Sequence, residues 1–171
     1  MATTERPTVV IDVVAKWAVD ATLYFAMAAG FLLWGVIARS ATVNILTFAI
    51  MATVAMLVDR LLPMLPDTPA LTDPHEAAPD GAVRRTWQRY AVGAAGVMAI
   101  LCAVYAVLVV YFVPPGFMAG WLTALCVARL RGLATAREIE RASHVRLSAR
   151  LQLSIWRRRT PAYYATPRLG V

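Results

Sequence analysis

Charged residues are scarce in this sequence, and the motifs of common enzyme chemistry are missing from it. Only 16% of its 171 residues are charged, whereas 60% are hydrophobic; soluble domains have about a quarter charged and about half apolar residues. The sequence contains no P-loop, no dinucleotide-binding glycine fingerprint, no nucleophile elbow and no HExxH motif. We therefore expect a protein that lies in lipid and has no catalytic site.

Cysteine and histidine occur only twice each, and neither pair suits the sites that these residues usually build. Cys102 and Cys126 both lie in apolar segments, which favours two small buried side chains over a disulfide framework. His75 lies in a Pro-rich segment and His144 in the tail, so no two histidines would face each other across a helix bundle to ligate haem. We expect no cofactor and no metal site.

Four uncharged apolar runs set the expected architecture. They are Ala21 to Ala38, Ala41 to Val58, Tyr90 to Val113 and Phe117 to Ala128. The first three are long enough to cross a hydrocarbon core of about 30 Å. The last is short, so a re-entrant half-helix competes with a span there. We favour a span, because the helix can continue into the tail and the arginines that follow can extend to the membrane surface.

Short turns join these runs in pairs. Only Arg39 and Ser40 separate the first two runs, and Pro114, Pro115 and Gly116 separate the last two. The expected fold is therefore an all-α membrane protein with four transmembrane helices in two antiparallel hairpins. Its regions would be an amphipathic segment with the first hairpin (1–62), a Pro-rich acidic loop (63–88), the second hairpin (89–128) and an Arg-rich tail (129–171).

The basic residues predict how the bundle is oriented. Ten of the seventeen basic residues follow Ala128, where the tail contains only two glutamates. Arg-rich flanks stay in the cytoplasm, so we expect a cytoplasmic tail and, after four crossings, a cytoplasmic N-terminus and acidic loop. The predicted location is the inner (plasma) membrane of a bacterium. The preference for Arg over Lys, with sixteen Arg and one Lys, is typical of a GC-rich source.

Small residues recur every four positions on three of the predicted helices. In lipid no hydrophobic force draws helices together, so such stripes mark faces where backbones approach closely. Packing within the bundle and contact with partner subunits are both open for each stripe, and the stripe that contains glycines is the strongest candidate for a partner. The residues concerned are Gly116, Gly120, Ala124, Ala128 and Gly132 on the fourth helix, Ala91, Ala95 and Ala99 on the third, and Gly30 on the first.

Three charged residues precede the first span at intervals of four. Asp12, Lys16 and Asp20 would line one face of a helix there and form ion pairs. Asp20 reaches the edge of the apolar run, where an ionisable group is a candidate for ion or proton relay. We favour a solvated helix start, because no second intramembrane acid, base or histidine accompanies Asp20.

The tail has two interpretations. Hydrophobic and polar residues alternate between Val145 and Ile155, which is typical of a strand. Such a strand would have to join a sheet edge of another chain or pair with a second copy. An amphipathic helix on the membrane surface is the alternative. A basic cluster follows that suits anionic lipid headgroups better than nucleic acid. The residues predicted to bind the membrane surface or a partner are Leu147, Leu151, Leu153, Trp156, Arg157, Arg158 and Arg159.

The stretch PTVVIDVVAKWAVDATLYFAMAAGFLLWGVIARSA, from Pro7 to Ala41, together with the two-hairpin layout, resembles small uncharacterised actinobacterial membrane proteins. Some of these are accessory subunits of mammalian-cell-entry (Mce) type lipid importers. The resemblance implies a place beside permease helices, with no ATP or substrate chemistry in this chain. We expect a non-catalytic accessory subunit of a larger membrane complex, with other membrane subunits as partners. A small homo-oligomeric transporter or channel is the alternative.

Overall fold

The structure is a computed structural model that describes residues 9–38, 40–61, 82–109, 112–150 and 163–167. Within these residues, four helices are long and apolar enough to cross a membrane. They are α1 (Val13–Ala38), α2 (Ala41–Leu61), α4 (Trp87–Val104), which the π-helical turn η1 (Tyr105–Val109) extends, and α5 (Pro115–Ser143). The protein is thus a mostly helical, multi-pass membrane protein.

The fourth of these helices is much longer than its apolar run. α5 continues without a break from Pro115 to Ser143, as the expected extension into the tail requires. Pro115 suits the first turn, because proline has no N–H to leave unpaired there. The helix ends before His144, whose φ of 51° is the left-handed conformation that closes many helices. The short run from 117 to 128 is therefore the first part of a helix about as long as α1.

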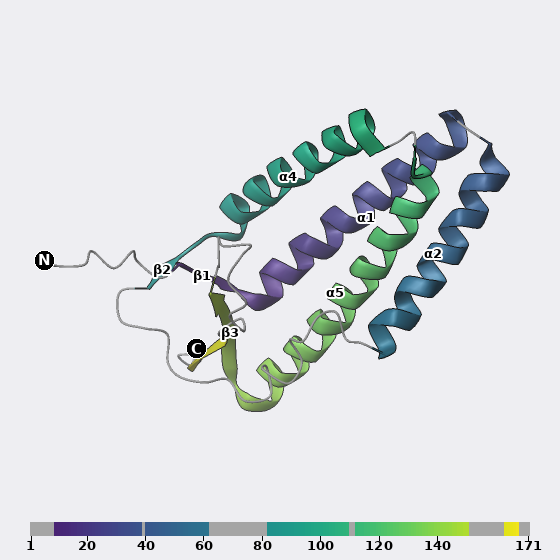
Figure 1. Cartoon of the computed structure of the whole chain (residues 1–171). Helices are drawn as coiled ribbons and strands as arrows, with labels where there is room; N and C mark the ends of the chain where they lie inside the picture. The colour runs from purple at the N-terminus through teal and green to yellow at the C-terminus, as the bar shows by residue number, and fades with distance from the viewer. Residues whose placement is uncertain (1–8, 39, 62–81, 110–111, 151–162, 168–171) are drawn as a thin grey trace, which may run out of the picture.

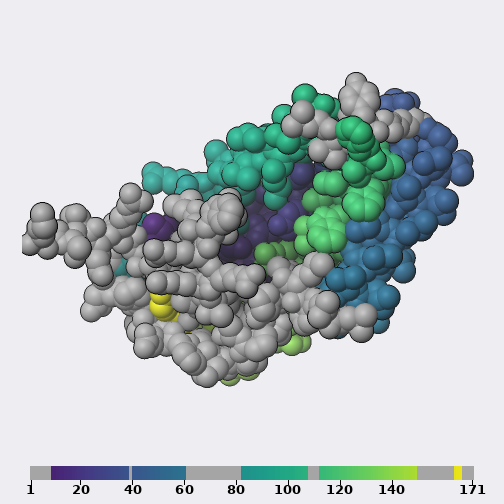
Figure 2. All heavy atoms as spheres, viewed as in Figure 1, coloured from purple at the N-terminus to yellow at the C-terminus, as the bar shows by residue number. Residues whose placement is uncertain are grey.

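Packing among the helices does not follow their order in the sequence. α1 and α4 run in one direction and α2 and α5 in the other (Figure 1). α5 packs along both α1 and α2, whereas the main helix contact of α4 is with α1. In the space-filling view, α1 lies recessed between α4 and α5 (Figure 2). Thus α1, α5 and α2 form a core and α4 lies on its flank. α1 and α2 are in contact, whereas α4 does not pack along α5 as the second expected hairpin would require.

Two hydrophobic clusters hold the core together. The first lies within the bundle and joins α1, η1 and α5. The second lies where α1 and α5 meet the sheet described below, and it includes residues of that sheet. Their buried members are Ala28, Phe31, Tyr105, Ala119 and Leu122 in the first, and Val13, Trp17, Leu133, Ala136, Leu147 and Ala149 in the second. The sheet is therefore packed onto the helices and is not a separate appendage.

Short strands form a four-stranded sheet at one end of the bundle (Figure 1). The strands are β1 (Val9–Asp12), β2 (Val83–Arg84), β3 (Val145–Arg150) and β4 (Tyr163–Pro167), in the order β2-β1-β3-β4. β1 is parallel to β2 and antiparallel to β3, and β3 is antiparallel to β4. The sheet thus joins the segment before α1, the segment before α4 and the segment after α5.

The strand expected in the tail is present, but its partners differ from the prediction. Leu147 is buried in β3, which pairs with β1 and β4 of the same chain. This sheet needs neither another protein nor a second copy, and the surface-helix alternative is wrong for Val145–Arg150. The partner strands β1 and β4 were not predicted, because runs of four or five residues show too little alternation between hydrophobic and polar residues. The tail residues Leu151, Leu153, Trp156, Arg157, Arg158 and Arg159 lie outside the described residues, as does most of the Pro-rich loop.

Candidate functional site

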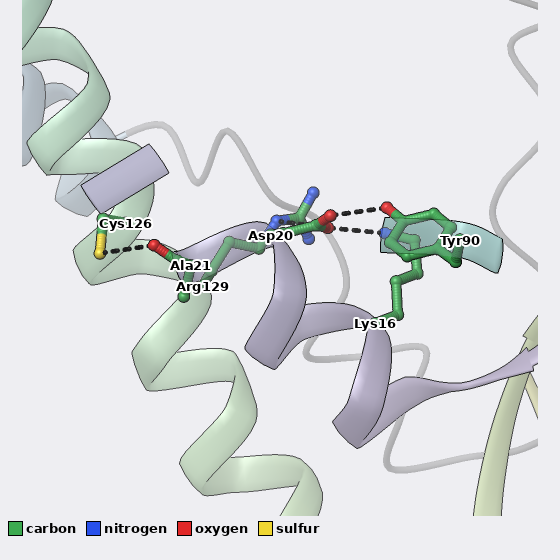
Figure 3. Close-up of polar contacts among 6 residues, drawn as sticks. All are labelled: Lys16, Asp20, Ala21, Tyr90, Cys126 and Arg129. Atoms are coloured by element: carbon green, nitrogen blue, oxygen red, sulfur yellow. Dashed lines mark hydrogen bonds and ion pairs between the residues drawn. The ribbon is translucent and has the colours of Figure 1, made fainter. Parts of the chain in front are cut away.

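Asp20 lies at the centre of a polar network that joins three helices (Figure 3). It is 7% exposed. Lys16, one turn earlier on α1, donates a hydrogen bond from Nζ to Asp20 Oδ2 at 3.0 Å. Tyr90 of α4 donates its hydroxyl proton to Asp20 Oδ1 at 2.6 Å, and Nε of Arg129 on α5 lies 3.7 Å from Oδ2. Asp20 is therefore a paired carboxylate that links α1, α4 and α5.

Aromatic rings flank the charges of this network. The guanidinium carbon of Arg129 lies 5.9 Å from the ring centroid of Trp17, and Lys16 Nζ lies 5.7 Å from that of Tyr90. At such distances a cation is attracted to the ring face. Gly132 leaves room for the indole, because a Cβ there would come within 2.9 Å of a Trp17 ring atom. The network and its rings form a close-packed junction between α1 and α5.

Of the three contacts of Asp20, only the one with Lys16 is predictable from the sequence. The Lys16–Asp20 pair follows from their spacing, but Tyr90 is 70 residues away and Arg129 lies on another helix. The signal that the sequence offers for these two residues is their position: Tyr90 begins the third apolar run, and Arg129 directly follows the fourth.

Asp12 was expected on the same helix face and lies elsewhere. It ends β1, and its Oδ1 accepts the N–H of Ala15 at 2.9 Å, as a helix-capping residue does. Its Oδ2 lies 3.1 Å from Nε of Arg146 in β3. The expected row of three charges is therefore one ion pair on α1 and one between the cap of α1 and the sheet.

The threonine hydroxyls of the spans provide no continuation of the Asp20 network. Thr22, Thr47, Thr53 and Thr123 each donate a hydrogen bond to the carbonyl oxygen four residues earlier on their own helix. A threonine bonded in this way has satisfied its donor locally. The arrangement around Asp20 thus suits the fastening of three helices.

Asn44 of α2 makes a second three-helix junction at the opposite end of the bundle. It is 1% exposed. Its Nδ2 donates to the carbonyl oxygens of Gly35 at 2.8 Å and Ser40 at 3.0 Å, and its Oδ1 accepts the N–H of Gly116 at 3.1 Å. The last bond satisfies one of the N–H groups that a helix start leaves without a partner. Asn44 therefore ties α2 to the end of α1 and the start of α5.

The glycine stripe of α5 lies against the other core helices. A Cβ at Gly116 would overlap the backbone carbonyl oxygen of Asn44, and one at Gly120 would lie 2.7 Å from that of Phe48. Such contacts are too short for any side chain, so α2 approaches α5 only because these positions are glycine. The stripe residues Gly116, Gly120, Ala124, Ala128 and Gly132 are all buried or half-buried within the chain. This face is used for packing inside the molecule.

α4 differs from the other three helices because none of its residues is buried. Two contacts tie it to α1. Tyr90 bonds to Asp20 near the start of α4, and the ring of Tyr105 in η1 packs edge-on against Phe31 with centroids 4.8 Å apart. The Tyr105 hydroxyl also donates to the Val113 carbonyl oxygen at 2.6 Å. Between these two contacts Ala94, Met98 and Cys102 are only half-buried, so α4 packs loosely on its own chain.

The small residues predicted on α4 and α1 lie on this weakly packed part. Ala91 is half-buried, whereas Ala95 and Ala99 are exposed. A Cβ at Gly96 would have no atom within 4 Å, and the same holds for Gly30 on α1. The stripe of α4 is thus open along most of its length, in contrast to the stripe of α5.

Comparison with known proteins gives no match to a protein-family model, to a curated protein or to a solved structure. The resemblance to actinobacterial membrane proteins therefore stays a prediction, and the function has to be argued from the arrangement of the helices.

Proposed function

We propose that the protein is a non-catalytic accessory subunit of a larger membrane complex and that it joins its partners through α4. The observation that carries this proposal is the packing of α4. This helix is of transmembrane length, has no buried residue and exposes a row of small residues between its two contacts with α1. Small residues let a neighbouring helix approach closely, which is how helices associate in lipid.

One row of α4 differs from the surface of a helix that faces lipid alone. Both α2 and α4 expose large side chains, such as Ile45 and Leu46 on α2 and Val97 and Ile100 on α4. On α4 these flank Ala95, Ala99 and Ala103, an exposed row of small residues at every fourth position. Such a row lets another helix approach closely, so it supports a protein partner for α4.

The sheet supports the proposed topology. Its strands come from the segments before α1 and α4 and after α5, so these three segments meet at one end of the bundle (Figure 1). That end also contains Arg84 and Arg85, and the tail (129–171), which has ten of the seventeen basic residues, runs along α5 into the sheet there. By the positive-inside rule this end faces the cytoplasm. We therefore place the protein in a bacterial inner membrane with both termini cytoplasmic.

The complex that the sequence resemblance suggests is an Mce-type lipid importer. In that setting α4 would lie beside the permease helices, and the sheet and tail would contact cytoplasmic parts of the complex. No observation favours the alternative of a homo-oligomeric channel, because the hydroxyls of Thr47, Thr53 and Thr123 are bonded to their own helices.

Purification in mild detergent of a tagged chain and its variants tests the proposal. We expect larger membrane proteins to co-purify with the natural chain and to be lost from Ala99→Leu, which adds bulk to the exposed face of α4. Ala49→Leu on α2 is the matched control, because Ala49 is also exposed and faces lipid in our proposal. It should retain the same partners.

Two results would contradict the proposal in different ways. A natural chain that purifies alone rules out the accessory role, and transport or conduction by that chain in liposomes would establish the alternative. Equal retention of partners by Ala99→Leu and Ala49→Leu would leave the role intact but exclude α4 as the contact.

A further inference from the structure

A polar hollow of about 230 Å³ opens where the sheet meets the start of α4. Three arginines line it, namely Arg84 of β2, the adjacent Arg85, and Arg146 of β3. The one acidic residue of the lining is Asp12. Three positive charges against one negative charge give the lining a net charge of +2, so the hollow suits an anion.

The charges of Arg84 and Arg85 are not compensated within the described part of the chain. Both residues are exposed, and neither forms an ion pair with a described residue. The carboxylate of Asp12 is already engaged, since one oxygen caps α1 and the other pairs with Arg146. Two guanidinium groups are thus left at the hollow, and guanidinium is the side chain best suited to a phosphate group.

Ser148 adds a hydroxyl group to the lining. It is 5% exposed and lines the hollow from β3. Because it lines the hollow, its hydroxyl can donate a hydrogen bond to an anion bound there. The hollow also adjoins the N-terminus of α4, where the capping residue Thr86 makes no side-chain bond, and helix N-termini attract anions.

An apolar hollow of about 500 Å³ adjoins the polar one. It lies between the starts of α1 and α4, and its lining includes Ala15, Thr22, Trp87 and Ala91. The two linings are adjacent, because Thr86 of the polar lining precedes Trp87, and Asp12 bonds to Ala15. A positive hollow at the end of the spans thus lies next to an apolar one between two of them.

We propose that these hollows bind one anionic glycerophospholipid. Its phosphodiester would be held by Arg84, Arg85 and the hydroxyl of Ser148, and an acyl chain would lie between α1 and α4 against Trp87. A soluble anion would need only the net positive charge. The adjoining apolar hollow therefore favours a lipid, which has both an anionic headgroup and acyl chains. The site is separate from the outward positions Ala95 and Ala99, so it does not depend on the accessory role proposed above.

Titration of the full chain in detergent with phosphatidylglycerol, followed by native mass spectrometry, tests this site. The double variant Arg84→Gln/Arg85→Gln should bind this lipid about thirtyfold more weakly, because each arginine near an anionic lipid contributes roughly fivefold. The matched control Arg137→Gln/Arg141→Gln removes the same charge from exposed positions of α5 that do not line the hollow. It should change binding less than about threefold, since diffuse attraction alone is weak.

Two further variants separate the site from a charged surface. Thr22→Phe fills the apolar hollow without altering charge, and it should weaken phosphatidylglycerol binding, whereas Thr53→Phe on α2 should not. Ser148→Ala should weaken binding by a few-fold, about the net contribution of one typical hydrogen bond. Circular dichroism and the unfolding midpoint in detergent verify that each variant is folded.

Four results would overturn the proposal. The two arginine pairs could weaken binding equally, which would indicate diffuse attraction. Phosphatidylcholine could bind as tightly as phosphatidylglycerol, which would exclude recognition of the anionic headgroup. Thr22→Phe could bind normally, which would exclude the acyl chain from the apolar hollow. Inorganic phosphate at millimolar concentration could displace the lipid, which would make the polar hollow a site for soluble phosphate.

Discussion

α4 and α5 carry the same sequence pattern and use it differently. Both have small residues at every fourth position, but those of α5 are covered by α1 and α2, whereas most of those on α4 are exposed. The difference lies in what faces each stripe. Gly116 and Gly120 meet the backbone of α2, while a Cβ at Gly96 would touch nothing. The spacing thus predicts that a helix can be approached closely but does not identify the helix that approaches it.

The largest effect that we expect comes from Gly116→Val on the packed stripe. The added side chain would overlap the Asn44 carbonyl oxygen, which is backbone and cannot rotate away. We expect a loss of about 3 kcal/mol or more in the free energy of unfolding, the upper end for overpacked sites. Unfolding of the purified chain in mixed detergent with increasing dodecyl sulfate measures it.

Gly30→Val is the matched control for this comparison, because a Cβ at Gly30 would have no atom within 4 Å. We expect it to change the free energy of unfolding by less than about 1 kcal/mol, the size of an intrinsic helix preference. Similar losses for both variants would show that α5 is not packed more closely than the open positions.

A smaller effect is expected from Asn44→Leu, which keeps the approximate size of the side chain and removes its hydrogen bonds. The N–H of Gly116 would lose its buried acceptor, and the fastening of α2 to α1 would be lost. We expect a loss of about 1–3 kcal/mol, the cost of leaving a buried polar group without a partner. Thr47→Val is the control, because the Thr47 hydroxyl bonds only within α2. A stability of Asn44→Leu equal to that of Thr47→Val would exclude a fastening role.

The number and positions of the spans could be predicted because they depend on local composition. An uncharged apolar run is visible in the sequence whatever it packs against, and the prediction of four membrane-crossing helices needed nothing else. The continuation of α5 beyond Ala128 also followed from local features, namely the absence of proline between Ala128 and His144. β3 was visible from its alternation, although its partners were not.

The pairing of helices and the surroundings of Asp20 could not be predicted, because both depend on residues that are distant in the sequence. Tyr90 and Arg129 reach Asp20 only because α4 and α5 come to lie beside α1. Likewise, β1 has only four residues. It is recognisable as a strand only because it pairs with β3, in the register that places Ile11 opposite Ala149. A single sequence contains no signal that shows which distant residues come into contact.

Tyr90→Phe should affect α4 more than the core. It removes the hydroxyl that holds the start of α4 to Asp20 while keeping the ring. A hydrogen bond to a charged group is worth about 1.5–3 kcal/mol when buried, and we expect about 1 kcal/mol here because the site is only partly buried and Lys16 still pairs with the carboxylate.

The informative readout for Tyr90→Phe is the distance between α1 and α4. Spin labels at two exposed positions, Phe25 on α1 and Val92 on α4, should give a broader distance distribution in the variant. A pair on the core helices, Leu33 and Ile50, should be unchanged. Broadening of both pairs would mean that Asp20 fastens the whole bundle and not α4 alone.

The last comparison adds one methyl group beside the open stripe of α4 and one on the packed stripe of α5. Gly96→Ala on α4 should stabilise the isolated chain slightly, by less than about 1 kcal/mol, because alanine favours the helix and nothing obstructs its Cβ. Gly120→Ala on α5 should destabilise it, because the same methyl group would lie 2.7 Å from the Phe48 carbonyl oxygen. Dodecyl sulfate unfolding of the two variants side by side compares the signs. If one stripe is covered and the other open, the changes in the free energy of unfolding must have opposite signs. A destabilised Gly96→Ala would mean that α4 is packed against its own chain.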